Sequence, residues 1–197
     1  MLIQALCQYY DMNTEEVSDG VPKYFENVEI SHKIFLTPEG KISSIQDIRE
    51  KVGIDGKKKP VVRKETFILP MRSQKPGIDL NIAEHRPLYI FGLNYDKKSD
   101  SFTPEDNTNK AKKSHECFVN GNLEFCEGLD SPIINAFREF LINWNPADET
   151  ENPHLKAISK DYSTASYCFV LEGRPDILLN NDALLKKKYT EYAESKE

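Results

Sequence analysis

Strand-like and helix-like segments occur in separate runs along this 197-residue chain. A helix-like segment comes first and two pairs of strand-like segments follow. Two helix-like segments, a further strand pair and a last helix-like segment complete the chain. Grouped strands and helices favour the α+β class over a parallel α/β sheet. We therefore predict an α+β fold, in which short antiparallel hairpins or a mixed sheet pack with four to five helices.

The helix predictions rest on apolar spacing and on start signals. Before the third helix, a side-chain oxygen of Asp130 or Ser131 can accept an orphan amide hydrogen bond, and the fixed φ of Pro132 suits a first turn. Pro146 ends this helix because proline disfavours helix in the preceding residue. Helices are predicted over 2–10, 109–126, 133–144 and 182–197.

The strand predictions rest on alternation and on turn residues. Alternation over 28–36, the turn TPEG at 37–40 and KISSI after it predict a hairpin. A weaker strand is predicted over 61–70, a buried strand over 88–93 and a second hairpin over 166–179. Polar residues without a period predict loops at 55–60 and 96–107, and we expect loose linkers at 51–60 and 96–108.

The sequence lacks the patterns of a common enzyme active site. GxSxG, HExxH, P-loop and GxGxxG motifs are absent. His115 and Cys117 are two residues apart on a predicted helix, so they point about 200° apart and cannot chelate one ion. The four cysteines are widely separated without a CxxC pair, which favours reduced thiols. We expect no enzyme activity, no cofactor and no metal site.

The apolar segments are too short for membrane insertion. No stretch approaches the roughly 20 apolar residues of a membrane span. The first apolar run, from Leu2 to Leu6, is too short for a signal peptide. We expect a cytoplasmic protein without a membrane partner.

Charge is segregated along the chain. Residues 51–113 contain 14 Lys and Arg against 8 Asp and Glu, whereas residues 1–50 contain 4 against 9 and residues 114–197 contain 8 against 15. The formal net charge of −6 argues against a general nucleic-acid coat. A basic middle between acidic flanks still allows one local site for a polyanion.

The basic middle supplies candidate contacts to a DNA backbone. A lysine-rich loop beside a basic strand could straddle phosphates and release condensed counterions. The alternative is a hairpin edge that lysine protects from aggregation. A second group of lysines opens the helix over 109–126, where a solvated helix face is the alternative. The candidate backbone contacts are Lys57, Lys58, Lys59, Arg63 and Lys64, with Lys110, Lys112 and Lys113 as the second group.

A polar run after Pro70 combines side chains that suit base edges or sugars. Arg72, Ser73, Gln74 and Lys75 lie between turn residues and offer a fork of donors, a hydroxyl and an amide. An inert surface loop can have the same composition. The aromatic residues lie in apolar periodic segments, so they are expected in the core and not on a base-stacking surface.

Several segments in one order resemble a known family. These segments are MLIQALCQYYD, VEISHKIFLTPEGKISSIQDIR, KKKP, LPMRSQKPGIDLNI with LYIFG, FREFLINWNP and CFVLEGRPDILLNNDALLKKKY. Together they are similar to the N-terminal region of the large subunit of the type I-C CRISPR Cascade complex. Arg72 and Ser73 match best to the family's Arg-Thr-Ser-Gly-Ile-like run. Lys75 and Pro76 depart from that run as an insertion.

The resemblance implies a role in DNA surveillance within antiviral defence. Residues 1–197 would form a single N-terminal DNA-sensing domain of a longer, non-catalytic subunit. The domain would recognise the protospacer-adjacent motif on double-stranded DNA and help to open the duplex, while the guide RNA reads the remaining sequence. Asn81 lies where family members carry a polar residue, and its amide is expected to read a groove edge. The other expected partners are the guide RNA complex and the neighbouring Cascade subunits.

Two other function classes stay open. A protein-interaction scaffold that docks neighbouring Cascade subunits without DNA affinity of its own is favoured by the acidic flanks. A nuclease or metal hydrolase is the third class, which bound metal or cleavage of nucleic acid would support.

Overall fold

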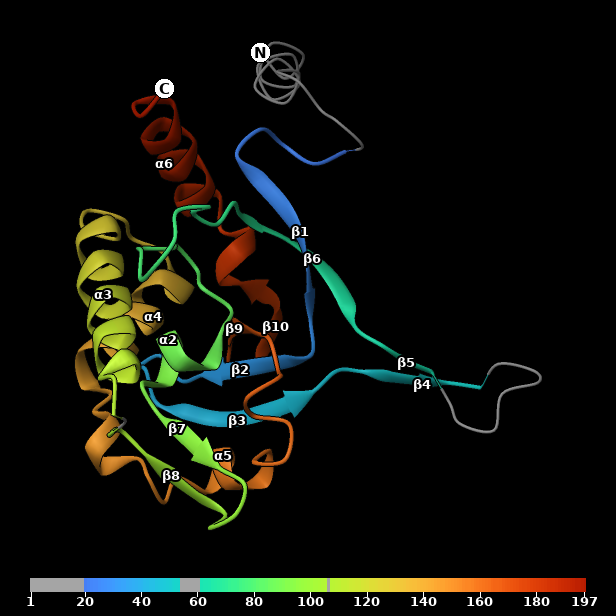
Figure 1. Cartoon of the computed structure of the whole chain (residues 1–197). Helices are drawn as coiled ribbons and strands as arrows, with labels where there is room; N and C mark the ends of the chain where they lie inside the picture. The colour runs from blue at the N-terminus through green and yellow to red at the C-terminus, as the bar shows by residue number, and fades with distance from the viewer. Residues whose placement is uncertain (1–19, 54–60, 106) are drawn as a thin grey trace, which may run out of the picture.

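A four-stranded mixed sheet pairs strands from residues 32–47 with strands from residues 167–178 (Figure 1). The computed structural model describes residues 20–53, 61–105 and 107–197, so the predictions for 2–10 and 55–60 lie outside the described residues. β2 and β9 are parallel, and the other neighbours are antiparallel. The order is β10-β9-β2-β3, with bounds Arg174–Leu178, Tyr167–Leu171, His32–Leu36 and Ile42–Asp47.

Both predicted hairpins of this sheet are confirmed, with one change. β2 pairs with β3 through the turn at 37–40, and β9 pairs with β10 through a turn that contains Gly173. The predicted strand over 28–36 is divided at Ser31. The backbone amides of Ser31 and His32 both donate to the carbonyl of Ser166, each at 3.0 Å. The chain therefore leaves one sheet and enters another at this residue.

Two short antiparallel ladders continue from the sheet. β1 (Phe25–Ile30) pairs with β6 (Glu65–Pro70), and β4 (Glu50–Val52) pairs with β5 (Val61–Arg63). The predicted strand over 61–70 is divided at Lys64 into β5 and β6, and β6 ends at Pro70, as predicted. β4 and β5 extend away from the sheet and the helices in Figure 1. We call residues 50–53 and 61–64 the arm.

Five helices are described, and the larger ones enclose an aromatic core. α4 packs on β2 and β9, and α3 packs on α2 and α4. Phe137 and Phe140 of α4 both meet the ring of Phe169 in β9, with centroids 4.9 Å and 5.5 Å apart. The helices are α2 (Pro87–Phe91), α3 (Lys110–Phe125), α4 (Pro132–Asn143), α5 (Pro153–Ala157) and α6 (Ala183–Glu194).

The helix starts follow local chemistry. Ser131 caps α4 by accepting from the amide of Ile134, with Pro132 in the first turn, as predicted. Asp182 caps α6 by accepting from the amides of Leu184 and Leu185. The α+β class with a mixed sheet, short antiparallel hairpins and helices is thereby confirmed. No helix of the described residues has the length and apolar character that crossing a bilayer requires.

Two sequence predictions were wrong. Residues 88–93 are not a strand, because Pro87 starts the short helix α2 and Gly92, with φ of +65°, ends it. The predicted loop at 96–107 contains part of a hairpin between β7 (Asn94–Asp96) and β8 (Ser101–Thr103). Phe102 of β8 is buried against Tyr162, so this stretch also contributes to the core.

Candidate nucleic-acid interface

The loop over residues 71–81 is held in shape by its own side chains. The amide of Ser73 donates to Asn81 Oδ1 at 2.9 Å, and Ser73 Oγ donates to Asp79 Oδ2 at 2.5 Å. Asn81 Nδ2 donates to the carbonyl of Asp79 at 3.1 Å. These bonds close the base of the 71–81 loop, while residues 74–77 are exposed at its tip.

Asn81 is buried and does not face solvent, with an exposed fraction of 6%. Its Oδ1 accepts from Ser73, and its Nδ2 also donates to Glu84 Oε2 at 3.1 Å. Its carbonyl accepts from Asn122 Nδ2 of α3 at 3.2 Å. A contact between Asn81 and a groove edge would break these bonds. In this structure Asn81 holds the 71–81 loop, and its expected role in reading a groove edge stays a prediction.

Glu84 is the buried acid behind the loop, with a side chain that is 0% exposed. Its Oε1 accepts from the backbone amides of His85 and Arg86 and from Arg86 Nε, at 3.0 to 3.1 Å. Its Oε2 accepts from Arg86 Nη2 at 2.6 Å. Burial would raise the pKa of Glu84, but the hydrogen bonds and charge of Arg86 outweigh burial and hold that pKa below its usual range. Glu84 is therefore a charged carboxylate at neutral pH.

Arg72 lies beside this acid, and its side chain is partly exposed. Its backbone amide donates to Glu26 Oε1 at 2.9 Å, and its buried Nε lies 3.8 Å from Glu84 Oε2 without a hydrogen bond. The side chain is 31% exposed, and its Nη groups have no hydrogen-bond partner among the described residues. Arg72 therefore presents donors and a positive charge at the base of the loop.

The arm presents a separate set of cations. Lys51, Arg63 and Lys64 are exposed on it, whereas Lys57, Lys58 and Lys59 lie outside the described residues. Arg63 and Arg72 are nine residues apart along a mostly extended chain, which separates them by up to about 30 Å. Among the described residues, Arg63 and Arg72 therefore do not share one small cleft. β6 connects the arm that carries Arg63 to the loop that carries Arg72 (Figure 1).

The lysines of α3 form a third group. Lys112 and Lys113 are exposed, and Lys112 lies 4.0 Å from Glu116 on the next turn. Lys112 lines a hollow of about 530 Å³ together with His115. The loop meets α3 further along, because Leu80 packs against Gly121. Nine residues of helix separate Lys112 from Gly121, about 14 Å. Lys110 lies in the first turn of the same helix.

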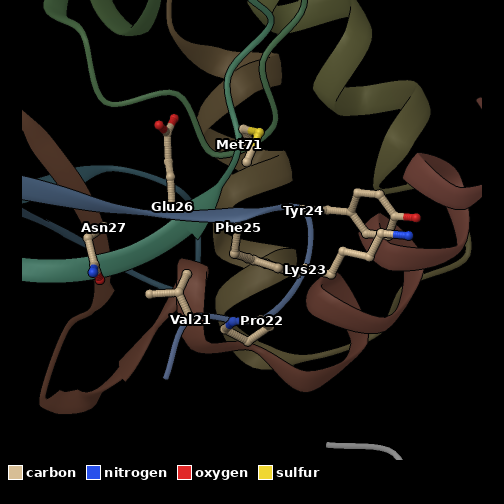
Figure 2. Close-up of a pocket in the computed structure, with 8 residues that line it drawn as sticks. All are labelled: Val21, Pro22, Lys23, Tyr24, Phe25, Glu26, Asn27 and Met71. Atoms are coloured by element: carbon tan, nitrogen blue, oxygen red, sulfur yellow. The ribbon is translucent and has the colours of Figure 1, made fainter. Parts of the chain in front are cut away.

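The loop is anchored from the other side by α6. Tyr189 Oη donates to the carbonyl of Met71 at 2.8 Å. Beside Met71 lies an open hollow of about 410 Å³ at the start of β1 (Figure 2). Figure 2 shows Val21 and Phe25 on one side of the strand and the carboxylate of Glu26 pointing away from them. The sequence analysis did not predict this hollow, which offers no cluster of catalytic groups among its lining residues.

A second cluster of ionisable groups lies at the edge of the sheet. Ligand atoms of His32, Asp47 and Asp161 lie within 4.8 Å of one another. The guanidinium of Arg49 pairs with both carboxylates, at 2.6 Å to Asp47 and 2.8 Å to Asp161. His32 Nδ1 lies 2.8 Å from Ser31 Oγ. The carboxylates of this cluster are therefore already paired with a cation, and the cluster ties β3 to the segment before β9.

Comparison with known proteins identifies one family over almost the whole chain. Residues 6–197 match the model of the family described as CRISPR-associated protein (Cas_Csd1). The chain belongs to this family. No curated protein matches it. The CRISPR part of the sequence resemblance is thereby confirmed. Membership in Cas_Csd1 indicates a CRISPR-associated role and interactions within a Cas complex.

Sequence reasoning missed two residues of this Cas_Csd1 chain that shape the site. Glu84 is buried and pairs with the partly exposed Arg86, and it also contacts Arg72 and Asn81. A signal for them was present, because Glu84 and Arg86 lie between two apolar runs, IA and PLYIF. Charged residues between buried apolar neighbours need partners, since an unpaired buried charge is costly. That pattern predicts an internal ion pair, although it does not predict what the pair supports.

Proposed function

We propose that this chain is the N-terminal domain of the large subunit of a type I-C Cascade complex. It recognises the protospacer-adjacent motif on double-stranded DNA and helps to open the duplex. The guide RNA then pairs with the target strand, and other Cascade subunits bind the remaining surfaces. The domain is non-catalytic, requires no cofactor and acts in the cytoplasm. Support comes from the CRISPR-associated family and from the site around Arg72.

The observation that carries this proposal is the guanidinium of Arg72. A planar fork of donors can bind the O6 and N7 atoms of guanine with two hydrogen bonds, the commonest specific contact in the major groove. The fork of Arg86 is occupied, because both Glu84 oxygens accept from it. The side chain of Arg72 is 31% exposed and its Nε makes no hydrogen bond, while Gln74 and Lys75, close by in the sequence, are exposed. Arg72 is therefore the residue that we assign to reading a base edge.

The arm and the loop would divide the work of binding. A two-stranded ribbon fits the major groove of B-DNA, and β4 with β5 forms such a ribbon. Lys51, Arg63 and Lys64 would bind phosphates there, which holds the duplex without reading its sequence. The predicted contacts Lys57, Lys58 and Lys59 stay part of this proposal, as do Lys110, Lys112 and Lys113.

Two exposed apolar side chains on the loop favour a role in duplex opening. Met71 is 46% exposed and Ile78 is 37% exposed, at the two sides of the polar tip. Apolar side chains inserted between base steps unstack and kink a duplex in many minor-groove proteins. Met71 and Ile78 are therefore candidates for a wedge beside the motif.

A salt titration tests the phosphate contacts. The chain is mixed with labelled duplex at several salt concentrations, and the logarithm of the binding constant is plotted against the logarithm of salt. Each neutralised phosphate contributes about −0.9 to the slope. We expect a clearly negative slope. A slope near zero would remove the multi-phosphate contact from the proposal.

The second candidate is a scaffold that docks neighbouring Cascade subunits without DNA affinity. The acidic excess of residues 114–197, with 15 Asp and Glu against 8 Lys and Arg, favours it. Duplex that stays unbound at low salt would favour the scaffold over DNA recognition.

A further inference from the structure

Glu84 bonds to the 71–81 loop and to the start of α2, but it is buried and cannot touch DNA. Its side chain is 0% exposed. One oxygen holds the start of α2, through the amides of His85 and Arg86. The other oxygen reaches the 71–81 loop, because Asn81 Nδ2 donates to it at 3.1 Å. The carboxylate therefore couples the loop to the helix that follows it.

The charge of Glu84 also fixes two arginines. Arg86 binds it with two nitrogens at 3.0 and 2.6 Å, and its guanidinium lies 4.2 Å from the centre of the Tyr89 ring. Arg72 is the second cation, with its Nε 3.8 Å from the same carboxylate. Without the negative charge, the two guanidinium groups would repel each other at short range. The direction in which Arg72 points therefore depends on Glu84.

Further hydrogen bonds connect Asn81 to the rest of the loop base. Asn81 Oδ1 accepts from the amide of Ser73, and Ser73 Oγ donates to Asp79. If Glu84 lost its charge, the amide of Asn81 would lose a charged acceptor, and a hydrogen bond to a charged group is stronger than a neutral one. The loop and Arg72 would then loosen together. A contact that reads bases needs rigid support from the residues behind it.

We propose that Glu84 is a positioning residue that sets how well this domain discriminates between DNA sequences, without contacting DNA itself. The inference rests on the proposed function of Arg72 and the 71–81 loop. The competing explanation is that Glu84 only neutralises the half-buried Arg86, so that the chain can fold.

The test uses the 197-residue chain and the variant Glu84→Gln. The probes are a library of short duplexes, randomised over a few adjacent base pairs, and one scrambled duplex. We expect discrimination between the best and the scrambled duplex to fall by about tenfold or more. Affinity for the scrambled duplex should stay equal or rise, because the variant carries one negative charge fewer. Glu172→Gln, an exposed acid in the β9–β10 turn, is the matched control for that charge change and should keep full discrimination.

The double variant Glu84→Gln with Arg86→Met separates positioning from folding. It removes the arginine that Glu84 neutralises, so we expect its melting temperature to recover while discrimination stays low. If the single variant does not fold, the double variant still tests whether Glu84 positions the loop. Retained discrimination in the single variant, or regained discrimination in the double variant, would overturn the inference. A wild-type chain that binds all library members equally would overturn the proposed function as well, and that result needs no variant.

Discussion

At the scale of single residues, Arg72 offers the most direct prediction. Arg72→Lys keeps the charge but loses the planar fork, and lysine cannot replace arginine where two parallel hydrogen bonds are made. We expect affinity for scrambled duplex to stay nearly constant, while discrimination for the motif falls by about 1 to 3 kcal/mol. Competition binding with motif and scrambled duplexes measures both. The control is Arg174→Lys, in an exposed pair with Asp176. Equal loss on both duplexes would make Arg72 a backbone contact.

Arg49 gives a prediction about acid stability. Its hydrogen bonds lower the pKa of Asp47 from 3.8 to about 2, and they also lower the pKa of Asp161. A carboxylate with a depressed folded-state pKa stabilises the fold above its unfolded-state pKa, and this stabilisation is lost as pH falls through the folded-state value.

We therefore expect Arg49→Gln to lower the free energy of unfolding by about 1 kcal/mol at neutral pH, a small value because both carboxylates are nearly half exposed. The difference from wild type should shrink between about pH 5 and pH 2. Urea unfolding at a series of pH values measures it. A difference that stays constant over this range would mean that the ion pairs do not stabilise the fold.

At the scale of elements, the arm should contribute affinity and little specificity. In Arg63→Gln with Lys64→Gln, two exposed cations are lost from the arm. We expect weaker binding to all duplexes by a similar factor, with a salt slope that is smaller by about 2. The matched control is Lys97→Gln with Lys98→Gln, two exposed lysines in the β7–β8 turn. An equal loss in both variants would indicate a general charge effect.

A helix or strand could be predicted where its start residues and apolar spacing lie within one segment of the sequence. α4 was predicted because Ser131, Pro132 and the apolar face all act within one segment. α2 was missed because five apolar residues fit a buried strand and a short helix equally well. The packing of α2 against α3 is a tertiary contact with no trace in the local pattern. The same limit applies to Asn81, whose partners Glu84 and Asn122 only the fold reveals.

At the scale of the whole molecule, the central strand pair could not be predicted from the sequence. His32 lies beside Tyr167 in parallel strands, and no local pattern records which distant strand is the partner. One hydrophobic core cluster contains Phe25 near the start of the described chain and Tyr189 near its end, with Phe91 and Phe137 between them in the sequence. Residues near the two ends of the described chain therefore stabilise each other.

A core shared by residues from the whole described chain predicts a single cooperative unfolding transition. Trp144 is the only tryptophan of the chain, and its indole Nε1 donates to the carbonyl of Phe91 at 3.0 Å, so its fluorescence reports on α2 and α4. Far-UV circular dichroism reports on all helices and strands. Because α4 packs on β2 and β9, which pair residues far apart in the chain, we expect the two signals to change at the same urea concentration. Two separate midpoints would show that the helices around Trp144 unfold independently of the sheet.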